Sequence, residues 1–67
     1  MNTYTAEIND SINKVTRHLT TTSRSAQEAH KAIWKGTFAH EEIVTMISVN
    51  HRKETRKVYD HHHGFME

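Results

Sequence analysis

Histidine is the chemically reactive residue that this sequence uses in greatest excess, with seven copies in 67 residues. A helix binds Zn²⁺ well when two histidines lie four residues apart, and no pair here has that spacing. His40 opens a stretch like the start of the zinc-protease motif, but Val44 stands where the second histidine is required. The adjacent His61, His62 and His63 would hold a metal only loosely. We therefore predict no metal site and no cofactor.

The same histidines give the chain a pH-dependent charge. Each titrates near pH 6.5, so protonation of all seven adds seven units to the formal net charge of +1 and brings it to +8. Repulsion among these charges opposes a compact state. We expect a fold or oligomer to lose stability between about pH 7 and 5.

Residues for catalysis are not arranged in any familiar pattern. The chain has no cysteine, which removes thiol chemistry and disulfides. Neither Ser23 nor Ser25 has the flanking glycines of a nucleophile elbow, and no glycine-rich phosphate loop is present. We predict that the protein is not an enzyme.

Two other groups of residues are candidates for binding. Arg52, Lys53, Arg56 and Lys57 put four cations in six positions, and on a helix they would form one basic face suited to a phosphate backbone. Trp34 and Phe38 flank Gly36, so a turn there would present an aromatic pair to a protein partner. The alternative for the aromatic pair is that both rings cap the core.

The first element that must position these residues is predicted to be a helix over 4–19. Large residues recur there at intervals of three and four, which is typical of an amphipathic helix. They are Tyr4, Ile8, Ile12, Val15 and Leu19.

A second helix is indicated after Ser25, because Glu28 follows three residues later and completes a capping box. The Thr/Ser run at 20–25 favours a break near 21–24, whereas a heptad register that continues through it favours one helix over 4–35. Both alternatives stay open, and Gly36 marks the end in either case.

The third element is predicted to be a helix that begins at Thr37 and carries Ile43 and Ile47 on its apolar side. The β-branched residues at 43–49 make a strand the alternative. Residues 61–67 lack any periodicity, so we expect a frayed tail after a single domain at 1–60.

The resulting fold class is all-α, a helical hairpin. Only 34% of the residues are hydrophobic, too few for a comfortable monomeric core of this length. We therefore expect a homodimeric helical bundle. Its core or dimer stripe would consist of Ile8, Ile12, Val15, Leu19, Ile33, Ile43 and Ile47.

The function expected from these features is that of a small, non-enzymatic regulatory or inhibitory protein. It would bind itself and a protein partner, with nucleic acid as the alternative partner, and such size and composition are typical of phage or plasmid accessory proteins. A third possibility is a segment that folds only on its partner. No secretory signal or membrane span is visible, so we expect a cytoplasmic protein.

Overall fold

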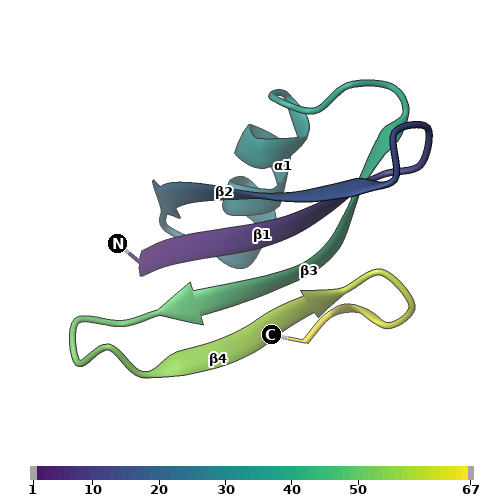
Figure 1. Cartoon of the computed structure of the whole chain (residues 1–67). Helices are drawn as coiled ribbons and strands as arrows, with labels where there is room; N and C mark the ends of the chain where they lie inside the picture. Colours follow the sequence, from purple (N-terminus) through teal and green to yellow (C-terminus); the bar gives the residue numbers. More distant parts are fainter. Residues whose placement is uncertain (1, 67) are drawn as a thin grey trace.

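The structure is a computed structural model that describes residues 2–66, and it consists of a β-sheet with one short helix (Figure 1). The elements in chain order are β1 (Asn2–Asp10), β2 (Val15–Ser23), α1 (Ala26–Trp34), β3 (Glu41–Val49), β4 (Thr55–Asp60) and β5 (Gly64–Phe65).

All neighbouring strands are antiparallel, in the order β2-β1-β3-β4-β5. The first strand therefore lies inside the sheet, between β2 and β3. Helix α1 packs on one face, over β2 and β1 (Figure 1). The turn between β3 and β4 lies at the far end of the sheet from the loop that follows α1 (Figure 1).

The prediction of an all-α hairpin, and with it the homodimeric helical bundle, is wrong. Residues 4–19 form β1, a turn and most of β2 rather than a helix. Tyr4, Ala6, Ile8 and Asp10 are buried at every second position, which is the period of a strand with one covered face. Because Tyr4 and Ile8 are four residues apart, their spacing fits a helix and a strand equally well.

The Thr/Ser run is neither a helix nor a break between helices, since it is the second half of β2. Its β-branched side chains suit an extended strand, and Thr5 and Thr20 lie opposite each other with their hydroxyl oxygens 3.2 Å apart.

Helix α1 is the part of the helical prediction that is confirmed. Ser25 is its N-cap, and the Ser25 hydroxyl accepts a hydrogen bond from the backbone N–H of Glu28 at 3.2 Å. The helix ends at Trp34, with Gly36 two residues beyond it. Ala26, Ala29 and Ile33 face the sheet and are buried.

The helix predicted from Thr37 onward does not exist, and the strand alternative at 43–49 is correct, because β3 covers these residues. Thr37 caps the helix before it instead, since its hydroxyl donates to the Trp34 carbonyl at 2.8 Å. The residues at 55–58 belong to β4.

Three turns of the sheet share one construction. Each begins at an Asp or Asn whose side-chain oxygen accepts a backbone N–H two residues ahead, and these residues are Asp10, Asn50 and Asp60. Each ends in a residue with positive φ, namely Lys14 (55°), Lys53 (63°) and Gly64 (75°). Hydrogen bonds between a side chain and the backbone two residues ahead therefore stabilise the start of each turn.

An ion pair between the partly exposed Arg17 and the buried Glu41 fixes the loop between α1 and β3. The guanidinium of Arg17 on β2 reaches across β1 and donates two hydrogen bonds of 2.7 Å to the carboxylate of Glu41. The same carboxylate accepts the backbone N–H of Phe38 at 2.9 Å. These hydrogen bonds hold the pKa of Glu41 below its usual value, with the Arg17 contact as the largest cause.

The last residues described also belong to the sheet. Residues 61–63 form a turn, β5 pairs with the end of β4, and the Met66 N–H donates to the Val58 carbonyl. Glu67, the final residue of the predicted tail, lies outside the described residues, as does Met1. Among residues 2–66, no helix has the length and apolar character that a membrane span requires.

Candidate functional site

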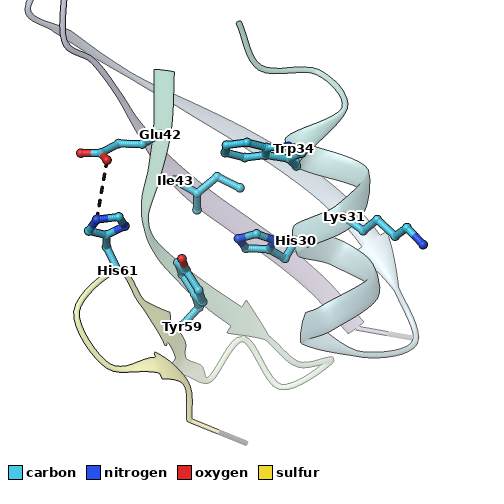
Figure 2. Close-up of a pocket in the computed structure, with 7 residues that line it drawn as sticks. All are labelled: His30, Lys31, Trp34, Glu42, Ile43, Tyr59 and His61. Atoms are coloured by element: carbon cyan, nitrogen blue, oxygen red, sulfur yellow. Dashed lines mark ion pairs between the residues drawn. The ribbon is translucent and has the colours of Figure 1, made fainter. Parts of the chain in front are cut away.

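A groove lies where α1 passes the β3 and β4 strands, and we call it the α1–β4 groove. Its volume is about 410 Å³, within the range of small-molecule and side-chain binding sites. Its surface is mainly apolar. The lining residues are His30, Lys31, Trp34, Glu42, Ile43, Tyr59 and His61 (Figure 2).

Two helix residues and two sheet residues form the body of the groove. His30 and Trp34 lie one turn apart on α1 and project toward the sheet, where Ile43 and Tyr59 face them (Figure 2). Ile43 is buried and belongs to the core, so one wall of the groove is a rigid core side chain. Trp34 is 54% exposed, which makes it a large apolar group facing solvent.

His30 is the centre of the aromatic contacts. Its ring lies 4.8 Å from that of Tyr59 and 5.4 Å from that of Phe65 on β5, between ring centroids. The Tyr59 and Phe65 rings are also in contact, at 5.0 Å. The short strand β5 therefore supports the groove from behind by packing against two of its lining rings.

Burial of His30 among these rings lowers the pKa of its imidazole below the usual 6.5. The imidazole is therefore neutral at pH 7, and the groove contains an uncharged aromatic ring at that position. A neutral lining suits an apolar ligand better than a phosphate or another anion.

Charged groups occupy the rim. The carboxylate of Glu42 and the Nε2 of His61 lie 3.7 Å apart on the sheet side (Figure 2). Lys31 extends from the outer side of α1, away from the other lining residues (Figure 2). An apolar interior with a mixed polar rim is the usual anatomy of a protein-binding hot spot.

The structure separates the two aromatic residues predicted to bind a partner. Trp34 lines the groove, whereas Phe38 lies outside it and is 64% exposed. The Phe38 ring stacks on His40, with 5.9 Å between ring centroids, and the guanidinium carbon of Arg17 lies over the Phe38 ring, 5.8 Å from its centroid. Sequence reasoning missed His30 and Tyr59. The four-residue spacing of His30 and Trp34 on a predicted helix was a usable signal for half of the groove.

The basic residues do not form one helical face. Arg52 and Lys53 lie in the β3–β4 turn, while Arg56 and Lys57 are neighbours on β4, where successive side chains alternate between faces. Lys57 pairs with Asp60 at 2.7 Å. The four cations are thus divided among a turn and two sides of a strand.

The predicted apolar stripe is also divided. Ile8, Ile33 and Ile43 are in the core, and Leu19 packs against it. Ile47 is half-buried on β3. Ile12 lies in the β1–β2 turn and is 70% exposed, and Val15 at the start of β2 is 55% exposed.

Other hollows and clusters in the described chain are less suited to binding. A larger hollow of about 520 Å³ beside the β3–β4 turn is lined by polar side chains such as Asn50 and Arg56. Within residues 2–66, His, Asp and Glu side chains form no group of three or more placed to hold a metal ion. Comparison with known proteins finds no matching family model, no matching curated protein and no matching solved structure.

Proposed function

We propose that this protein is a non-enzymatic binding module that takes up an apolar or aromatic side chain of a protein partner in the α1–β4 groove. The observation that carries the proposal is the position of Trp34, half-exposed at the edge of an apolar groove with a core residue as its opposite wall. Tryptophan is the residue type most enriched at binding hot spots.

A module of this kind acts by occupying or masking its partner, which is the mode of action of a small regulator or inhibitor. The lack of cysteine is compatible with the reducing cytoplasm as its location. Nucleic acid receives less support as the partner, because the four cations are divided between a turn and two sides of β4.

Selection of peptides from a displayed random library on the immobilised protein tests the proposal. We expect the enriched peptides to share an apolar or aromatic anchor residue. Trp34→Ala should weaken their binding by about 30-fold or more, the effect of losing a hot-spot residue worth about 2 kcal/mol.

Phe38→Ala is the matched control, since it removes another exposed aromatic ring, and this ring lies outside the groove. Circular dichroism of both variants establishes that they are folded. Equal affinities of the Trp34→Ala and Phe38→Ala variants for the selected peptides would place binding elsewhere and contradict the proposal, as would selection of peptides with no common anchor.

A further inference from the structure

The strand β2 forms one outer edge of the sheet. All nine of its residues pair with β1, without a register shift, and no strand from residues 2–66 lies on its other side (Figure 1). Half of its backbone N–H and C=O groups therefore point outward from the sheet. An edge of this length is a template for pairing with another strand.

The opposite edge of the sheet carries features that discourage such pairing. Strand β4 has a register shift beside Lys57, two cations at Arg56 and Lys57, and two residues of β5 covering its end. Bulges, edge cations and short covering segments are the means by which proteins protect sheet edges. The β4 side of the sheet is therefore protected against pairing with a further strand, whereas the β2 edge lacks such protection.

The composition of β2 favours pairing. Val15, Leu19 and four threonines are residue types that suit strands, and proline is absent from the sequence. The only permanently charged residue of β2 is Arg17. Its guanidinium is directed back across the sheet to Glu41, so it does not hinder the pairing of another strand with the β2 edge.

We infer that the β2 edge binds a second copy of this chain, in an antiparallel pair of β2 strands centred on Leu19. The strand is self-complementary in this register, because no charged residue lies opposite a charge of the same sign. The register pairs Val15 with Ser23, Thr16 with Thr22, Arg17 with Thr21, His18 with Thr20, and Leu19 with its own copy.

A two-fold axis perpendicular to the sheet produces this pairing and places both helices on the same face. His30 contacts Tyr59, so this flank of α1 faces β4, and the opposite flank, toward the β2 edge, carries Glu28 and Ala32 at 100° per residue. Ala32 is exposed and small. Ala32 therefore presents a short side chain to the second helix across the axis, and Glu28 lies one turn before it on the same flank. The α1–β4 grooves lie on the flanks away from the axis, so the dimer leaves them accessible.

Charge substitutions on the uncovered face of β2 test the pairing and its register together. Thr16 and Thr22 are exposed and lie opposite Asn9 and Thr3 within the chain, so neither contacts a charge directly across β1. In the inferred dimer they lie opposite each other across the axis. The double variants T16K/T22K and T16E/T22K differ in one residue, and they place like and opposite charges across the interface.

Sedimentation velocity from about 10 to 200 μM should give the wild type twice the chain mass of 7.8 kDa at the upper concentrations. We expect T16K/T22K to raise the dissociation constant at least 10-fold and T16E/T22K to keep or lower it, with both differences shrinking at high salt. Circular dichroism verifies the fold of each variant.

Three results would overturn the inference. They are a wild type that stays monomeric throughout this range, a dimer that T16K/T22K does not weaken, and equal weakening by the two double variants. The last result would mean a different register or a different surface.

Discussion

The imidazole of His30 lies parallel to the indole of Trp34, with an interplanar angle of 6° and ring centroids 6.3 Å apart. The two residues are four positions apart on α1, so one helical turn holds the rings one above the other (Figure 2). Nearly parallel planes with centroids at this separation are typical of an offset-stacked aromatic pair. The two rings therefore form one wall of the α1–β4 groove, with Ile43 on the sheet side.

The titration of His30 is the first prediction. The chain contains one tryptophan, so its fluorescence reports on the groove. Protonated imidazole quenches a neighbouring indole, and we expect a fall in emission on acidification with a midpoint below pH 6.5, because burial lowers the pKa of His30. His30→Gln should abolish this step, and His51→Gln, in the exposed β3–β4 turn, should preserve it. A midpoint above 6.5 would contradict the geometry.

His30 also links stability to pH. Its pKa is lower in the folded chain than in the unfolded one, so the unfolded state binds more protons below about pH 6.5. This contribution therefore destabilises the fold as pH falls from about 6.5, and the loss stops growing below the folded-state pKa. Urea titrations should show that His30→Phe loses less stability than the wild type between pH 7 and 5. An identical pH dependence in both would rule out this contribution.

The acidic groups change stability with pH in the same sense as His30, but at lower pH. Glu41 has a lowered pKa because of Arg17, and Asp10 has one because the backbone N–H of Asn13 donates to its carboxylate. Their contribution is fully present above the unfolded-state values of about 4.5 and 3.8 and is lost as pH falls through the lower folded-state values. Glu41→Gln should lower the Tm at pH 7, and the difference from wild type should shrink toward pH 2.5. Glu54→Gln, on the exposed turn, should change the Tm little at either pH.

Two isoleucines four residues apart test the sheet directly. Ile8 is fully buried, so Ile8→Ala should cost about 2–5 kcal/mol of unfolding free energy. A domain of this length has roughly 3–10 kcal/mol in total, so this variant is close to unfolding at room temperature. Ile12→Ala, in the turn, should change stability by less than about 0.5 kcal/mol. Equal losses in urea denaturation would favour a shared apolar stripe and contradict the strand.

A lysine with positive φ offers a stabilising substitution. Lys53 has φ of 63°, a conformation that costs most residues about 1–2 kcal/mol and glycine much less. Lys53→Gly should therefore raise the unfolding free energy by about 0.5–1 kcal/mol. The same substitution at Lys31, inside α1, should lower it by about 1 kcal/mol. A destabilising Lys53→Gly, measured by thermal unfolding, would mean that the turn has another conformation.

Local signals in the sequence identified only part of this fold. Ser25 and Glu28 marked the helix start because a cap depends on neighbouring residues alone. The spacing of Tyr4 and Ile8 led to the wrong prediction of a helix, because four residues fit the period of a helix and that of a strand equally well. The Asx turns at Asp10 and Asn50 were readable from sequence, and the turn at Asp10 would have divided the predicted first helix.

The candidate site was predictable to a smaller extent. Trp34 stood out by residue type and by its position beside Gly36. The contact of His30 with Tyr59 depends on the register of β4 against β3 and on the placement of α1, which are long-range properties of the assembled sheet. Periodicity within a short window contains no information about such a contact.

The position of β1 inside the sheet affects how the chain folds during synthesis. This strand is made first, but Tyr4 pairs with Ser48, which follows late in the sequence. At about 5–20 residues per second the ribosome needs several seconds to supply that partner. During this interval the β1–β2 hairpin has no β3 to pair with, so one side of β1 stays unpaired. Completion of the sheet is therefore a late and comparatively slow event for so short a chain, because distant pairing slows folding.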